Sequence, residues 1–131
     1  MLSKSFDEKM SIAMARGTVV LDENLLNLRD GLQKRNIRVL VPTSGMSDET
    51  IKEQMLANRI LITNNSKDFI SDASSYDYGI IATESLSSKD IKNVVQKIHE
   101  AFITHELWSK RHGFIVYLKD TGPSDFKSLT V

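Results

Sequence analysis

The feature that most constrains the fold of this chain is an uninterrupted apolar stretch that ends in an acidic residue. Residues 17–22 read Gly-Thr-Val-Val-Leu-Asp. An apolar run without alternation is typical of a strand buried on both faces, as the central strands of parallel sheets are. Ligands of open α/β sheets bind outside the carboxyl ends of the strands. The pattern therefore predicts a central strand at 18–22 and places Asp22 where such a fold keeps its chemistry.

Further apolar runs follow this strand and alternate with segments of helical periodicity. We expect strands at 18–22, 37–41, 59–63, 79–82 and 113–118, and helices at 5–15, 24–35, 88–108 and after Ser47. Strands that alternate with helices predict right-handed crossovers and a mainly parallel sheet. The sequence thus predicts a three-layer α/β domain with about five strands flanked by helices. We expect the strand at 18–22 inside the sheet, between the second and the fourth strands.

The length of the chain and its two ends suggest one domain with extensions. A chain of 131 residues suits a single domain. Residues 1–16 are expected to add an N-terminal helix, and residues 119–131, which show no period, a surface tail. The N-terminal helix has an apolar side that includes Phe6, Met10, Ile12 and Met14. Unless this side packs on its own domain, it predicts a contact with a second copy or with a partner protein.

Composition excludes several functional classes. Lys+Arg and Asp+Glu both number 17, so the chain has no overall charge that would favour nucleic acid. Cysteine is absent, which excludes disulfides and thiolate metal sites. No apolar run approaches the roughly 18–20 residues that span a bilayer. The N-terminus carries Asp7 and Glu8 and lacks the apolar core of a secretory signal, so a cytoplasmic location without a membrane partner is expected.

The histidine and lysine patterns indicate surface positions rather than a site. His99, His105 and His112 are six and seven residues apart, which misses the spacing of paired metal ligands on a helix. Five basic residues crowd the last helix and its end: Lys89, Lys92, Lys97, Lys110 and Arg111. A solvated helix face explains them, and contact with a phosphate backbone is the functional alternative.

Polar side chains stand at three positions that a doubly wound sheet can bring to one edge. Asp22 follows the first strand. Asp48 and Glu49 open the helix after Ser47, and Asn65 and Asp68 follow the strand at 59–63. Carboxylates held together repel one another unless a cation neutralises them, and hard oxygen ligands are preferred by Mg²⁺ and Mn²⁺. Such an ion activates water for attack on a phosphodiester.

Several of the polar residues near these positions also have an ordinary explanation. Asp48 and Glu49 are favoured at a helix start by capping and by the helix dipole. Asn64 and Asn65 suit a turn. The hypothesis of a metal site therefore depends on their joint placement.

The same residues occur in an order that resembles a known family. The segments are Val20-Leu21-Asp22-Glu23-Asn24-Leu25, Ser47-Asp48-Glu49-Thr50-Ile51 and Ala57-Asn58-Arg59-Ile60-Leu61-Ile62-Thr63-Asn64-Asn65-Ser66-Lys67-Asp68-Phe69. Together they are similar to the PIN-like nucleases, in particular to the DUF5615 group that is related to the Mut7-C domain. That family has an aspartate at the end of its first strand, an Asp-Glu pair opening a helix, and a Thr-x-Asp/Asn…Asp-Phe segment after the next strand. The resemblance covers about residues 17–105.

The resemblance implies a divalent-metal-dependent ribonuclease, often the toxin of a toxin–antitoxin pair. Asp22, Asp48 and Asp68 would form its acidic site and hold Mg²⁺ or Mn²⁺, with Glu49 and Asn65 as further ligands. Its substrate would be RNA, cleaved to leave a 5′-phosphate and a 3′-hydroxyl. A cognate antitoxin and a second copy of the chain are the implied protein partners.

The resemblance also assigns two supporting residues and shows one departure. Thr63 would lie beside the site as a hydrogen-bonding residue, and Lys67 would contact the substrate. Asn65 stands where many relatives carry an aspartate. The missing charge lowers the expected metal affinity, although the Asn carbonyl oxygen can still act as a ligand.

A response-regulator receiver domain is the alternative interpretation. That family also places paired acids after strand one, a Thr or Ser after strand four and a Lys after strand five, as Asp22-Glu23, Thr83 and Lys119 are placed here. Its phospho-accepting aspartate after strand three is missing, since this strand ends in Ile62-Thr63-Asn64. The alternative function is thus a non-catalytic interaction module, either receiver-like or a degenerate PIN-like domain.

Overall fold

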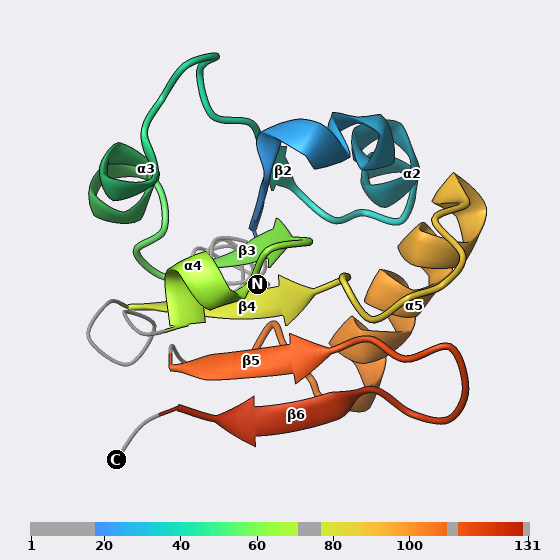
Figure 1. Ribbon diagram of the computed structural model, residues 1–131. Coiled ribbons are helices and arrows are strands. Elements are labelled where there is room, and N and C mark those ends of the chain that lie inside the picture. Colours follow the sequence, from blue (N-terminus) through green and yellow to red (C-terminus); the bar gives the residue numbers. More distant parts are fainter. Residues whose placement is uncertain (1–17, 71–76, 110–112, 130–131) are drawn as a thin grey trace, which may run out of the picture.

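The chain folds around one six-stranded sheet. A computed structural model describes residues 18–70, 77–109 and 113–129. In these residues the strands lie in the order β2-β1-β3-β4-β5-β6, and all neighbours are parallel except β5 and β6 (Figure 1). The predicted α/β class, with a mainly parallel sheet flanked by helices, is confirmed. The helix predicted at 5–15, with the interface suggested for it, lies outside the described residues.

The bounds of the elements are as follows. The strands are β1 (Val19–Leu21), β2 (Val39–Leu40), β3 (Arg59–Thr63), β4 (Tyr78–Ala82), β5 (Phe114–Tyr117) and β6 (Asp125–Ser128). The helical elements are the 3₁₀ helix η1 (Glu23–Leu28), α2 (Arg29–Lys34), α3 (Asp48–Gln54), α4 (Lys67–Ile70) and α5 (Ile91–Thr104). No helix in the described ranges has the length and apolar character needed to cross a membrane.

Alternation along the strands divides the core into two layers of side chains. Val19 and Leu21 of β1 join the cluster formed with η1, α2 and α5, whereas Val20 joins the cluster on the opposite side with α3 and α4. Successive strand residues point to opposite faces, and both faces here are covered by helices. The unbroken apolar run at 18–22 is therefore explained by burial on both sides.

The two helical layers cover different parts of the sheet. The first cluster includes Leu28, Leu32, Val94, Val95, Ile98 and Phe102 from the helices. The second includes Phe69 of α4, with Ile51 and Met55 of the α3 segment packed against it. Figure 1 shows α3 and α4 together on one side of the molecule and α2 and α5 on the other.

One of the two neighbours predicted for the first strand is correct, and the other is wrong. β1 lies inside the sheet beside β2, as expected, but its other neighbour is β3 and not β4. Val19 is in register with Ile60, and the Ile60 amide donates to the Thr18 carbonyl at 3.0 Å. β2 has only two residues, so it suits the edge, while the longer and largely apolar β3 takes the inner position next to β1.

The predicted surface tail at 119–131 contains a strand that was not predicted. Residues 125–128 form β6, antiparallel to β5, with Val116 opposite Phe126. The Phe126 ring stacks on Phe114 at 5.4 Å between centroids, and Lys119 pairs with Asp125 at 3.0 Å. These contacts across the hairpin explain a strand that shows no period in the sequence.

The predicted helices exist but are shorter or less regular than expected. The segment at 24–35 begins as η1 and becomes an α-helix only at Arg29, with a kink at Leu25. The segment at 88–108 is helical from Ile91 to Thr104. Asp90 caps its start by accepting a hydrogen bond from the Asn93 amide at 3.3 Å.

Candidate functional site

The sheet has a topological switch point between β1 and β3. From β1 the chain moves outward to β2 and then crosses to β3 on the other side of β1. In open α/β sheets, such a reversal leaves a crevice outside the carboxyl ends of the two strands, where ligands bind. Asp22 directly follows β1, and Thr63 is the last residue of β3. The candidate site is therefore built from the residues around these two strand ends.

Asp22 is held by a side chain from the neighbouring strand. Thr63 is fully buried, and its hydroxyl donates to Asp22 Oδ2 at 2.7 Å. Asp22 occupies the N-cap position of η1, yet its side chain makes no capping hydrogen bond. An aspartate in that position usually caps the helix. Here the Thr63 hydroxyl fixes the carboxylate at the strand ends.

Asn65 and Asp68 extend this arrangement into α4. The Asn65 backbone amide donates to the Thr63 hydroxyl at 3.0 Å, and the Asn65 side chain donates to Asp68 Oδ2. Asp22, Thr63, Asn65 and Asp68 thus form one hydrogen-bonded chain, which we name the switch-point network. All four were predicted as site residues from the sequence.

The loops beside this network are tied together by further polar contacts. Asn24 of η1 donates to the Asn64 side-chain oxygen at 3.3 Å, which joins the segment after β1 to the segment after β3. Lys67, the predicted substrate contact, is the first residue of α4 and is exposed. Its position beside Asp68 is compatible with contact to an anionic ligand.

Glu84 is a site residue that the sequence interpretation missed. Its carboxylate accepts from the Ser66 amide at 3.2 Å and from the Ser66 hydroxyl at 2.9 Å. Ser66 is buried and lies between Asn65 and Lys67. Glu84 follows the end of β4 by two residues, much as Asp22 follows β1, so the same attention to acids after strand ends would have found it.

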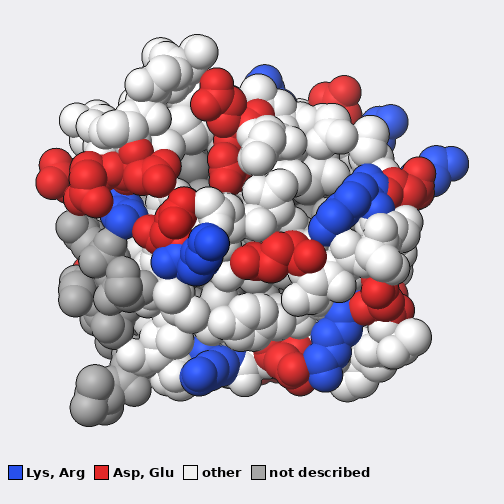
Figure 2. All heavy atoms as spheres, viewed as in Figure 1, with Lys and Arg blue, Asp and Glu red and all other residues white. Residues whose placement is uncertain are grey.

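Asp48 and Glu49 lie in a different setting from the switch-point network. They open α3, where the Ser47 hydroxyl accepts from the Thr50 amide at 3.2 Å, so the predicted N-cap is confirmed. Asp48, Glu49 and Glu53 are exposed, and Figure 2 shows acidic side chains gathered where α3 lies in Figure 1. Asp48 and Glu49 are stabilised by the dipole at the start of the helix, and all three acids lie on its exposed surface.

The expected gathering of acids is not formed. In the ranges that the structure describes, no three or more His, Asp or Glu side chains are grouped so that they could hold a metal ion. Asp48 and Glu49 therefore do not join Asp22 and Asp68 in one cluster. The metal role of each single residue stays a prediction.

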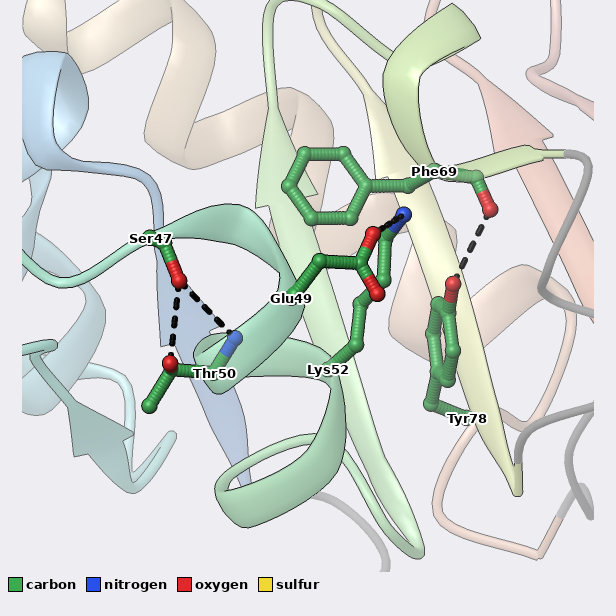
Figure 3. A network of polar contacts seen from close by, with 6 residues as sticks. All are labelled: Ser47, Glu49, Thr50, Lys52, Phe69 and Tyr78. Atoms are coloured by element: carbon green, nitrogen blue, oxygen red, sulfur yellow. Dashed lines mark hydrogen bonds and ion pairs between the residues drawn. The ribbon is translucent and has the colours of Figure 1, made fainter.

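Glu49 instead contacts a buried lysine beneath α4. Lys52 is only 5% exposed, and its ammonium lies 3.5 Å from Glu49 Oε1 and 5.3 Å from the centroid of the Phe69 ring. Figure 3 shows this group, with the Tyr78 hydroxyl donating to the Phe69 carbonyl at 2.9 Å. Phe69 belongs to α4 and Tyr78 to β4, so these contacts hold α4, with Asp68 next to Phe69, on the sheet. The sequence interpretation did not single out Lys52.

The residues of the receiver-like alternative have other partners. Thr83 is buried, and its hydroxyl donates to the Thr63 carbonyl at 3.4 Å. Lys119 pairs with Asp125, while Lys89 donates to the Thr83 carbonyl at 2.9 Å. Neither Thr83 nor Lys119 is directed to Asp22 by these contacts.

Asp120, which follows β5, shows a lowered pKa at the same edge of the sheet. The Ser87 backbone amide donates to Asp120 Oδ1 at 3.0 Å, and this hydrogen bond is the main cause of the lowered pKa. The Ser87 hydroxyl and the charges of Lys97 and Lys89 lower the pKa further. Lys89 and Lys97 therefore interact with Asp120 of their own chain.

Two histidines also have defined partners. Arg35 Nη1 lies 3.2 Å from His99 Nδ1, and His105 Nε2 is 2.8 Å from the Ser124 hydroxyl oxygen. Both rings are half-buried, so these two histidines are less exposed than the predicted surface positions suggest. His112 lies outside the described residues.

Comparison with other proteins found no similar protein. Searches against family models, curated proteins and solved structures gave no match for this chain. The functional conclusion must therefore come from the residues at the switch point.

Proposed function

We propose that the crevice between the ends of β1 and β3 is the site of a PIN-like, divalent-metal-dependent ribonuclease. The observation that carries the proposal is the switch-point network of Asp22, Thr63, Asn65 and Asp68. It combines two carboxylates with an amide and a hydroxyl at the place where α/β sheets bind ligands. As in the family that the sequence resembles, the ribonuclease is proposed to act as a toxin restrained by an antitoxin.

The donor atoms of the network suit a hard cation in a particular way. Mg²⁺ is usually held by one or two carboxylates, with water and substrate phosphate completing its shell. Asp22 and Asp68 supply two carboxylates, and Asn65 supplies a carbonyl oxygen. A bound Mg²⁺ or Mn²⁺ would polarise the scissile phosphate and lower the pKa of its water.

The protein groups have separate tasks in this proposal. Thr63 fixes the orientation of the Asp22 carboxylate, since its hydroxyl donates to one oxygen and leaves the other available. Glu84 holds the loop through Ser66, so that Asn65 and Asp68 keep their place next to Thr63. Lys67 offers an exposed ammonium to a substrate phosphate.

The test compares melting curves with and without Mn²⁺, together with cleavage of a structured RNA. Ligands that bind only the folded state raise the melting temperature. We expect Mn²⁺ to stabilise the wild type and Asp22→Asn to abolish both the stabilisation and the cleavage. Asn65→Asp places a third carboxylate beside Asp68, so it should lower stability without metal and enlarge the stabilisation by Mn²⁺.

Glu53→Gln is the matched control, because it removes the same charge from an exposed position on α3. It should keep the metal-dependent stabilisation and the cleavage of the wild type. A wild type that Mn²⁺ does not stabilise, together with an Asn65→Asp variant that gains nothing, would contradict the proposed function.

A non-catalytic interaction module is the second candidate function. It is favoured by the absence of a three-acid group in the described residues and by the neutral amide at Asn65. In that case the network would be a structural tie between η1 and α4. The same melting experiment distinguishes this module from the ribonuclease, because a purely structural network predicts no stabilisation by Mn²⁺ in any variant.

A further inference from the structure

A groove runs between α2 and α5, on the side of the sheet opposite to α3 and α4. Its volume is about 860 Å³. The two helices meet closely at Gly31, where an added Cβ would lie 2.8 Å from Val95 Cγ2. Gly31 and Val95 therefore form the floor of the groove, with more widely separated side chains on either side.

The charge of the groove differs from that of the whole chain. Lys34, Arg35 and Lys92 line it against a single acid, Asp30, whereas the chain as a whole has no net charge. Lys34 and Lys92 are exposed, and the Arg35 guanidinium is held by its hydrogen bond to His99. Grooves lined by one sign of charge concentrate ligands of the opposite sign.

The cations are spread along the groove. Lys34 and Arg35 are at the end of α2, while Lys92 is in the first turn of α5. Both helices follow parallel strands and run in the same direction, so the cations lie at opposite ends, separated by on the order of 10 Å. A single small anion cannot contact both ends. A chain with repeated charges can.

One end of the groove is formed by η1, the element that follows Asp22. Asn27 lines the groove and belongs to η1, the same element that carries Asn24 and starts directly after Asp22. α5 starts on the same side of the sheet, beyond the carboxyl end of β4. A chain that occupies the groove is thereby led toward the switch-point network.

We infer that this groove binds the backbone of single-stranded RNA and leads it to the site between β1 and β3. The inference rests on the proposed ribonuclease function and names the path of its substrate. Lys34, Arg35 and Lys92 contact phosphates, and the exposed amide of Asn27 is available for ribose and base edges. Asn93 donates to the Ser88 carbonyl at 3.3 Å and Gln96 to Glu100 at 2.9 Å, so these two side chains offer their oxygens as acceptors. Such a combination of a basic groove and polar side chains is typical of single-strand binding.

An acidic protein segment is the competing occupant. Peptides that bind grooves are anchored by apolar side chains in apolar pockets. Here the exposed apolar wall is limited to Ile91, beside the narrow floor at Val95. The amides and spaced cations fit a polyanion with hydrogen-bonding groups better than an apolar anchor.

The experiment measures RNA binding apart from cleavage. A fluorescent single-stranded RNA of about 12 nucleotides is titrated with the Asp22→Asn protein, and in parallel with wild type in a chelator, between about 50 and 200 mM salt. The slope of log affinity against log salt becomes shallower by about 0.7 for each phosphate that the protein no longer neutralises. K34Q/K92Q should therefore reduce the slope by about 1.4 and weaken binding by roughly three- to tenfold.

The control removes two exposed cations from another part of the molecule. K119Q/K127Q has the same change in net charge, in the hairpin of β5 and β6. It should leave the slope and the affinity close to those of the parent protein. Equal weakening in the two double variants, or no RNA binding by either parent at low salt, would overturn the inference.

Competition with a polyglutamate peptide of similar charge separates the two occupants. If the peptide displaces little of the bound RNA, the result supports the RNA path. If the peptide binds more tightly than the RNA, and this binding is abolished in K34Q/K92Q, the inference of an RNA path is overturned in favour of an acidic protein segment. Because binding is measured without divalent metal, a protein that binds RNA in the groove but does not cleave it would contradict only the proposed function.

Discussion

Two regions of this molecule carry acids next to a residue with a hydroxyl group, and the acids behave differently. At the end of β1, Asp22 does not cap η1 and accepts a hydrogen bond from buried Thr63. At the start of α3, Ser47 caps the helix, while Asp48 remains exposed on its first turn. The first acid is fixed by another strand, and the second belongs to its own helix.

The difference shows why a strand end and a helix start are not equivalent sources of site residues. A residue after a buried strand is positioned by the sheet, since the neighbouring strand ends at the same edge. A residue in the first turn of a helix is already favoured by the helix dipole and needs no other partner. Measurements on the two regions can test whether this distinction holds.

The largest effect on stability is expected for Thr63→Val. Valine keeps the volume of the buried side chain but removes the donor to Asp22 and the acceptor of the Asn65 amide. Removing the partners of partly buried polar groups should lower the free energy of unfolding by about 1–3 kcal/mol. Urea denaturation of wild type and variant measures the difference.

Thr83→Val is the matched control for that prediction. Thr83 is also buried at a strand end, but its hydroxyl makes only a long hydrogen bond of 3.4 Å to the Thr63 carbonyl. Its removal should cost less than about 1 kcal/mol. If both valine variants were destabilised equally, the hydrogen bonds of Thr63 would have no special weight.

Much of the fold could be predicted from the sequence because burial leaves a direct pattern. The apolar runs at β1, β3 and β4 identified these strands, and Ser47 identified the start of α3 through its capping role. These features depend on local side chains alone. They do not require knowledge of which elements are neighbours in space.

The errors concern features that depend on distant partners. β6 is stabilised by Phe126 against Phe114, and the position of β3 beside β1 follows from the path of the chain after β2. Glu84 acquires its role only through Ser66, on a loop 18 residues away. Pairings of this kind leave no period in a single sequence.

The next effect in size is expected for Ser47→Ala. The serine hydroxyl accepts a hydrogen bond from the Thr50 amide, and amides in the first turn of a helix lack an acceptor within the helix itself. Replacing an N-cap serine by alanine typically costs about 1 kcal/mol, and the same destabilisation is expected here. Ser44→Ala, in the exposed loop before α3, should leave the urea midpoint unchanged. A destabilisation as large at Ser44 would mean that the loop, and not the cap, determines stability in this region.

The smallest effect is expected for Asp48→Asn. The carboxylate of Asp48 is exposed, and its interaction with the dipole of the short helix α3 contributes only about 0.5 kcal/mol. Since Asp48 does not join Asp22 and Asp68 in a cluster, the variant should keep the Mn²⁺-dependent stabilisation and the RNA cleavage proposed for the wild type. The measurement is the melting curve with and without Mn²⁺, beside that of Asp22→Asn. A stabilisation by Mn²⁺ that disappears equally in both variants would place Asp48 in the site, as the family resemblance implies, and would show that an acid at a helix start can serve the same site as an acid at a strand end.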